Sequence, residues 1–145
     1  MLFRSARNYT ADTFVQKVGN KLALQRELGL TVDADVPMIA MITRLSGQKG
    51  LDLVECVLNE IMNTGCQVVV LGKGDDNFVD MFLNAAMRYH GRIAARIEMN
   101  HGLAHRIYAG SDMFLMPSKF EPCGLSQMIA LRYGSLPIEI GRAHV

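Results

Sequence analysis

The chain has 145 residues and is half hydrophobic, so it is long enough for one compact domain and too apolar to be disordered. Its formal net charge of +1 gives no basic field for nucleic acid, and no apolar run approaches the ~20 residues that span a bilayer. The 3 cysteines are scattered without metal-ligand spacing, as in a reduced protein of the cytoplasm. We therefore expect a cytoplasmic protein that binds neither nucleic acid nor membrane.

Helical and strand-like segments alternate along the chain. In order, the expected elements are a helix over about 14–28, a strand over 37–43, a helix over 51–62, a strand over 67–72, a helix over 76–89, a strand over 92–98, a short helix over 103–109, a strand over 113–116, a helix over 125–133 and a strand from 136. Several strands are apolar without polar alternation, which is typical of strands buried on both faces.

This alternation predicts the fold class α/β, with a Rossmann-like, doubly wound parallel sheet covered by helices on each side. Ligands of such sheets bind at the carboxyl ends of the strands. The loops that lead from a strand into a helix are therefore where chemistry is expected.

The loop at 43–50 follows a strand and opens a helix. It holds two cations, Arg44 and Lys49, together with two glycines and the N–H groups of a helix start. Arg44 can bind two oxygens at once and Lys49 adds a compact charge, so the loop suits an anion such as a diphosphate. The residues alone leave open that it is a surface loop that happens to be basic.

The loop at 117–126 also leaves a strand and opens a helix. Glu121 can accept hydrogen bonds from sugar hydroxyls, Gly124 permits close approach of a ligand, and the backbone N–H groups from Cys123 to Ser126 lie at the helix start. The alternative is that Glu121 is only a favourable charge at a helix terminus.

Two further features contain residues of the kind that bind ligands or metals. The loop at 72–76 begins like a dinucleotide fingerprint but lacks a third glycine, so we interpret it as a tight turn that borders the ligand. His101 and His105 are four residues apart, but Gly102 replaces the glutamate of a zinc-protease helix. We expect no metal there, and expect His105 and Arg106 to pack and hydrogen-bond beside the sheet.

These loops resemble motifs of one enzyme family, the bacterial glycogen synthases and plant starch synthases. Segments 43–45 and 48–53 look like its phosphate-gripping loop, 104–112 is similar to a second stretch, and 120–125 resembles its most characteristic motif. Segments 20–21 and 25–30 fit the part that leads into the second lobe of these enzymes. The resemblance runs from about Tyr9 to Ile138.

The resemblance implies a GT-B fold, in which two Rossmann-like lobes enclose the active site. It implies transfer of glucose from ADP-glucose to the non-reducing end of an α-1,4-glucan, with retention at the anomeric carbon. ADP-glucose is a substrate, and neither a cofactor nor a metal is implied. The expected partners are ADP-glucose or ADP, the glucan acceptor and the N-terminal lobe of the same enzyme.

The resemblance also assigns roles to residues. Arg44 and Lys49 would neutralise the diphosphate leaving group, and Glu121 would sit at the donor glucose, which makes these three the candidate catalytic residues. The candidate substrate-binding residues are Met99 at the base, the backbone of Cys123, Gly124 and Leu125 at the sugar hydroxyls, and Ser126 near the phosphates.

Both ends of the chain depart from the family pattern. We expect residues 1–138 to be a C-terminal lobe cut short, with Met1 an internal methionine, so that the chain alone is inactive. Residues 139–145 replace an expected Thr-Gly-Gly-Leu segment, and one back-translation of them matches a common short-read sequencing adapter. Our hypothesis is an artefactual tail, and recovery of the same codons from independently amplified genomic DNA would contradict it.

The sequence alone leaves three other functions to consider. The chain could be a non-catalytic nucleotide-binding or interaction module, or a GT-B glycosyltransferase that uses another donor such as UDP-glucose. A nicotinamide-dependent oxidoreductase lobe is disfavoured, because the third glycine and an acidic residue for the ribose are both missing.

Overall fold

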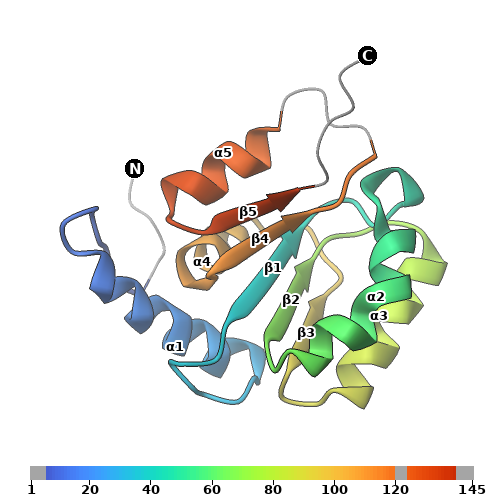
Figure 1. The fold of residues 1–145 in the computed structure, drawn as a ribbon, viewed down its shortest axis with the longest axis horizontal. Helices are drawn as coiled ribbons and strands as arrows, with labels where there is room; N and C mark the ends of the chain where they lie inside the picture. The colour runs from blue at the N-terminus through green and yellow to red at the C-terminus, as the bar shows by residue number, and fades with distance from the viewer. Residues whose placement is uncertain (1–5, 120–123, 140–145) are drawn as a thin grey trace.

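Five parallel strands form the centre of the structure, a computed structural model that describes residues 6–119 and 124–139 (Figure 1). They lie in the order β3-β2-β1-β4-β5. The strands are β1 Met38–Ile42, β2 Gln67–Leu71, β3 Ile93–Arg96, β4 Met113–Met116 and β5 Leu136–Glu139. Each expected strand is present, although β3 is shorter than the sequence pattern predicted.

The helices also follow the expected order, with small shifts at their ends. They are α1 Lys17–Leu28, α2 Leu51–Asn63, α3 Asp76–Arg88, α4 His101–Gly110 and α5 Leu125–Arg132. The helix predicted from residue 14 begins with a 3-10 turn, η1 Phe14–Gln16. Helix α4 starts two residues earlier than predicted, because the Asn100 side chain accepts a hydrogen bond from the Leu103 N–H at 2.9 Å and caps it.

Helices cover both faces of the sheet. Helices α2 and α3 pack on one face, and α1, α4 and α5 pack on the other (Figure 1). Strand β2 shows how one segment serves both layers, because Val68 and Val70 face α2 and α3 while Val69 faces the opposite layer. The expectation that central strands are buried on both faces is confirmed for β2, whereas the edge strand β5 leaves Leu136 63% exposed.

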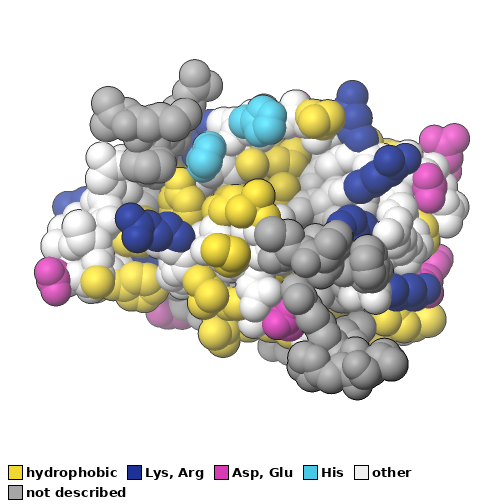
Figure 2. Space-filling model, turned by 90° about the horizontal axis from the view of Figure 1, so that it is seen from above, with side chains coloured by type: hydrophobic (Ala, Val, Ile, Leu, Met, Phe, Trp, Pro, Cys, Tyr) yellow, Lys and Arg dark blue, Asp and Glu magenta, His cyan; other side chains and the backbone are white. Residues whose placement is uncertain are grey.

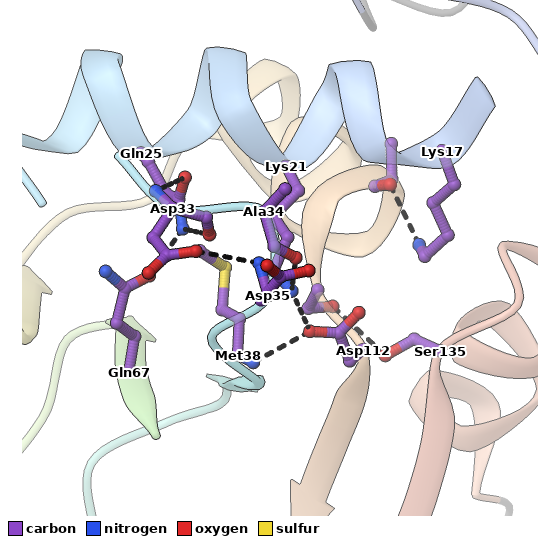
Figure 3. Close-up of polar contacts among 12 residues, drawn as sticks. Lys17, Lys21, Gln25, Asp33, Ala34, Asp35, Met38, Gln67, Asp112 and Ser135 are labelled. Carbon is purple, nitrogen blue, oxygen red and sulfur yellow. Dashed lines mark hydrogen bonds and ion pairs between the residues drawn. The ribbon is translucent and has the colours of Figure 1, made fainter. Parts of the chain in front are cut away.

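A polar network joins α1 to the starts of the strands (Figure 3). Buried Lys21 forms an ion pair with Asp112 at 2.7 Å, and the same carboxylate accepts a hydrogen bond from the N–H of Met38, where β1 begins. Buried Gln25 donates to the side chain of Gln67, the first residue of β2, at 2.9 Å. These contacts hold the end of the sheet opposite the strand carboxyl ends.

The strand order reverses beside β1. From β1 the chain builds outward through β2 to β3, and it then crosses back to add β4 and β5 on the other side of β1. The loops that follow β1 and β4 therefore lie next to each other at the carboxyl ends of the strands. Such a reversal is where open parallel sheets bind ligands.

Candidate functional site

The loop after β1 packs directly against the loop after β4. Gly50 has a φ of +75°, and a Cβ atom there would overlap the carbonyl oxygen of Pro117. The N–H of Lys119 donates to the carbonyl of Gln48 at 3.1 Å. Only glycine fits at position 50, because it tolerates this backbone conformation and leaves room for the second loop.

A depression of about 160 Å³ lies between these two loops. Its lining includes Arg44 and Lys49 from the first loop and Ser118 and Ser126 from the second. The structure thus brings together three residues that the sequence singled out, although about 80 residues separate Arg44 from Ser126. Glu121 and Cys123 lie outside the described residues.

The positive charge of the first loop comes from side chains rather than from the start of α2. Asp52 lies in the first turn of that helix, so a carboxylate of the chain itself already faces the positive helix end. The same carboxylate forms an ion pair with the Lys119 ammonium, with Oδ2 and Nζ 2.6 Å apart. The hydrogen bond from Lys119 lowers the pKa of Asp52. Arg44 is exposed, and its guanidinium forms no hydrogen bond or ion pair with residues 6–119 or 124–139.

A larger depression of about 510 Å³ adjoins the first and shares Ile42, Thr43 and Arg44 with it. The loop after β2 forms part of its floor, because Gly72 and Gly74 lie so close to the first loop that a Cβ on either would overlap a carbonyl oxygen of that loop. This places residues 72–74 at the border of the crevice. We call the two depressions together the crevice.

The far wall of the crevice comes from the segment between β3 and α4. Met99 lines the larger depression and is 78% exposed, so its side chain can pack against a flat ligand. Figure 2 shows hydrophobic, histidine and basic side chains gathered on the face seen from above. An apolar hollow beside a polar one suits a ligand with an apolar ring and a charged group.

Three lining residues of the larger depression were not assigned a role from the sequence. They are Lys73, Glu98 and His101. The available signal was their position, since Lys73 and Glu98 each follow a strand and His101 opens a helix. Only the meeting of three loops in the folded chain shows that the three residues share a cavity.

The first turn of α5 positions Ser126. Gly124 precedes the helix with a φ of +65°, a conformation that favours glycine. Leu125 points outward and is 61% exposed, whereas Ser126 is half-buried and lines the smaller depression. Burial raises the pKa of Tyr108, and a hydrogen bond with the Ser126 side chain partly opposes that rise.

The expectation for His105 and Arg106 is confirmed. His105 Nδ1 lies 3.0 Å from the hydroxyl of Tyr133, and Arg106 forms an ion pair with Glu27 at 2.7 Å. Across residues 6–119 and 124–139, no group of three His, Cys, Asp or Glu side chains is arranged to hold a metal ion. None of the helices in that same part of the chain has the length and apolar character of a membrane span.

Solved structures place this fold among GT-B glycosyltransferases. The catalytic domain of starch synthase IV from Arabidopsis thaliana, bound to ADP and acarbose, superposes with a TM-score of 0.86 and 36% identity, covering 94% of this chain and 28% of the other. WaaG, a glycosyltransferase of lipopolysaccharide biosynthesis, superposes with a TM-score of 0.64 over 94% of this chain and 34% of its own, but at 14% identity it shows the fold alone.

Relatives in sequence indicate to which glycosyltransferases the chain is similar. The chain is 52% identical to a glycogen synthase of Clostridium acetobutylicum over 131 residues, which is 90% of this chain and 28% of the relative. It is 56% identical to a glycogen synthase of Geobacillus thermodenitrificans over 130 residues, 90% of this chain and 27% of the relative. No protein-family model matches the chain. The resemblance to glycogen and starch synthases is thereby confirmed, for a chain that spans about 28% of the length of such a relative.

Proposed function

We propose that the chain is the nucleotide-sugar-binding lobe of a glucan synthase that transfers glucose from ADP-glucose to the non-reducing end of an α-1,4-glucan. One observation carries this proposal. Arg44 and Lys49 from one loop and Ser126 from another line a single depression where the strand order reverses, beside a hollow that suits a nucleoside. The ADP bound to the starch synthase of similar fold supports the choice of nucleotide.

The smaller depression would hold the diphosphate. When the bond between the anomeric carbon and the diphosphate breaks, negative charge grows on the departing oxygen. Arg44 can bind two phosphate oxygens through its planar guanidinium, Lys49 adds a point charge, and the Ser126 hydroxyl can donate a hydrogen bond. Such preorganised charge stabilises the transition state more than the ground state, which is what accelerates the reaction.

The larger depression would hold the nucleoside. Met99 can pack on the base, as the resemblance implied, and Glu98 can accept hydrogen bonds from ribose hydroxyls. The choice of adenine as the base rests on the ADP bound to the starch synthase of similar fold. UDP-glucose is the alternative donor, and UDP should then compete with ADP.

The roles proposed for residues at the sugar end of the site rest on the resemblance to glycogen and starch synthases. Glu121 is proposed at the donor glucose, with the backbone at Cys123, Gly124 and Leu125 holding its hydroxyls. Gly124 and Leu125 stand at the start of α5, beside Ser126, which suits that role. Retention of configuration at the anomeric carbon is part of the same proposal, and the proposed chemistry uses neither a metal ion nor a cofactor.

Polypeptide beyond the matched region would complete the enzyme. Because the chain spans about 28% of a relative's length, we propose that an N-terminal lobe supplies the other wall of the cleft and the glucan site. We expect the purified 145-residue chain to incorporate no measurable glucose from ADP-glucose into glycogen. Incorporation above the rate of a boiled sample would refute this part of the proposal.

The decisive experiment is calorimetric titration of the chain with ADP, run beside the double variant Arg44→Ala, Lys49→Ala. We expect ADP affinity to fall about 100-fold in the variant, since two charge-assisted contacts to phosphate are lost. The matched control is Arg26→Ala, Arg132→Ala, which removes the same charge from two exposed positions away from the crevice. Equal weakening in both variants would mean that net charge, not the crevice, binds ADP.

Competition separates the remaining alternatives. Displacement of ADP by UDP would favour a different sugar donor. Displacement of ADP by NAD at similar concentration would favour an oxidoreductase lobe. A non-catalytic module would bind ADP, but it would bind ADP-glucose and ADP-ribose equally well, because it would have no site for the glucose. Tighter binding of ADP-glucose would support the glycosyltransferase assignment.

A further inference from the structure

Helices α4 and α5 both run away from the crevice. The start of α4 contributes His101 and Ala104 to the larger depression, and the start of α5 contributes Ser126 to the smaller one. Their other ends lie on the side where the strands begin, at Gly110 and Tyr133. The geometry of the crevice therefore depends on how these two helices are held relative to each other.

Lys17 joins the far ends of both helices. Its Nζ donates to the carbonyls of Tyr108 and Ala109, in the last turn of α4, at 2.9 and 2.8 Å. It also donates to the carbonyl of Tyr133, which follows α5, at 3.1 Å. Lys17 comes from α1 and is 5% exposed (Figure 3). The last carbonyls of a helix lack partners within it and carry partial negative charge, so one buried cation satisfies two helix ends.

Other contacts reinforce this tie. The hydroxyl of Tyr9 donates to the carbonyl of Tyr133 at 2.5 Å and lies 3.3 Å from Lys17 Nζ. The ring of Tyr133 stacks on that of Tyr108 at 5.8 Å, and Tyr108 stacks on Phe114 of β4 at 5.0 Å. The Tyr108 phenol in turn interacts with Ser126, so a chain of contacts leads from Lys17 to the crevice.

Helix α5 depends on such ties because apolar packing holds it weakly. Ala130 is the one residue of α5 that is fully buried, whereas Leu125, Met128 and Leu131 are each more than half exposed. The helix is 8 residues long, little more than two turns, so loosening at its end reaches its first turn.

We infer that Lys17 is a positioning residue for the crevice, holding the far ends of α4 and α5 so that their first turns keep the spacing a nucleoside diphosphate requires. The ligand named here rests on the proposed function, whereas the positioning of the two helices does not. Lys17 itself touches no ligand. Its effect on binding is exerted through the helices.

The test compares Lys17→Met with Lys21→Met. Lys21 is the matched control, because it is equally buried on the same helix but bonds Asp112 and the carbonyl of Ala34 instead of the helix ends. Hydrogen exchange should become about tenfold faster at the hydrogen-bonded amides of α4 and α5, from Ala104 and Met128 onward, in Lys17→Met, with at most about twofold change there in Lys21→Met. ADP affinity should fall about tenfold in Lys17→Met alone.

Rescue by arginine distinguishes positioning from general support of the fold. A cavity of about 320 Å³ adjoins Lys17, so Lys17→Arg has room for the larger guanidinium and keeps the charge and donors. We expect Lys17→Arg to regain slow exchange and most of the ADP affinity. Equal exchange and affinity in Lys17→Met and Lys21→Met would overturn the inference.

Two further outcomes remain decisive. If the parent chain binds no ADP, the proposed function fails, and the hydrogen-exchange rates alone then test the positioning role of Lys17. If Lys17→Met does not fold, Tyr9→Phe replaces it, because it deletes one donor to the carbonyl of Tyr133 and leaves α4 untouched. Faster exchange confined to α5 would then support the inference, and unchanged exchange in both helices would overturn it.

Discussion

The two ends of the sheet use cationic side chains in opposite ways. Where the strands begin, Lys17 and Lys21 are buried and each donates to oxygens of the chain itself. At the carboxyl ends, Arg44 and Lys73 are exposed around a crevice. At the first end the charges hold the fold, whereas at the second end they are exposed where the proposed function places a diphosphate. Burial and internal partners, rather than residue type, separate a structural lysine from a candidate binding residue.

Helix direction explains the difference. In this parallel sheet, α4 and α5 present N–H groups at the carboxyl ends of the strands and carbonyl groups at the opposite end. The carbonyl ends are bound by Lys17 of α1, whereas the N–H ends suit an anion. The arrangement favours a cation of the chain at one end, and at the other end it agrees with the phosphate site of the proposed function.

The largest expected effect comes from Gly50→Ala at the crevice end. The new Cβ would overlap the Pro117 carbonyl and require a left-handed backbone, so the free energy of unfolding should fall by about 3 kcal/mol. Chemical denaturation measures this directly. Gly47→Ala is the control in the same loop, because no atom lies within 4 Å of its added Cβ. Equal stability of the two variants would show that the loops do not pack as described.

The pH dependence of the unfolding free energy tests the end of the sheet where the strands begin. Burial lowers the pKa of Lys17 to about 8 from 10.5, with Asp112 opposing the shift. The folded chain therefore releases this proton at lower pH than the unfolded chain. Stability contributed by Lys17 should rise as pH increases from 8 to 10.5, by about 2–3 kcal/mol at most.

The difference in unfolding free energy between the parent chain and Lys17→Met isolates this contribution. It should move in favour of the parent chain across that window and stay flat below pH 8. Burial raises the pKa of Tyr9 to about 12 from 10.0, but Tyr9 is present in both proteins, so its contribution largely cancels in this difference. A difference that is constant from pH 6 to 10 would contradict a lowered pKa of Lys17.

Asp112→Ala should have an intermediate effect. It leaves the buried ammonium of Lys21 without its carboxylate and removes the acceptor of the Met38 N–H. Because Asp112 is partly exposed, we expect a loss of about 2 kcal/mol in unfolding free energy rather than the larger penalty of a fully buried pair. Thermal denaturation would measure it, with exposed Asp35→Ala as control. ADP affinity should stay within about twofold, since the Asp112 carboxylate contacts Lys21 and the Met38 N–H rather than the carbonyl ends of α4 and α5.

The smallest expected effect is that of Glu27→Ala. Its ion pair with Arg106 is partly exposed, although two guanidinium nitrogens contact the carboxylate. Such pairs contribute less than about 1 kcal/mol, and salt screens them. The difference from the parent chain should disappear in ~1 M salt. A loss that persists at high salt would mean that Glu27 contributes through packing instead.

Much of the candidate site was predictable because its signals are local. The apolar runs of β1 and β2, the glycines that end helices, and the cations after β1 all follow from residues close together in sequence. Sequence patterns also placed Arg44 and Lys49 on one loop. The resemblance to glycogen and starch synthases added Met99, and it favoured the sugar-binding interpretation of Glu121, which the residues alone left open beside a helix-terminus charge.

The tertiary structure decided which loops meet. Only the order β3-β2-β1-β4-β5 puts the loop after β1 beside the loop after β4, and that order depends on packing between segments far apart in the chain. The roles of Lys17 and Asp52 were likewise hidden, because a lysine near a helix start and an aspartate in a first turn look like ordinary surface residues in sequence. Burial and long-range partners gave them their roles, and neither quantity is encoded in local spacing. The chain's pattern of residues determined its elements and their chemistry, while the three-dimensional packing determined which of those elements form one site.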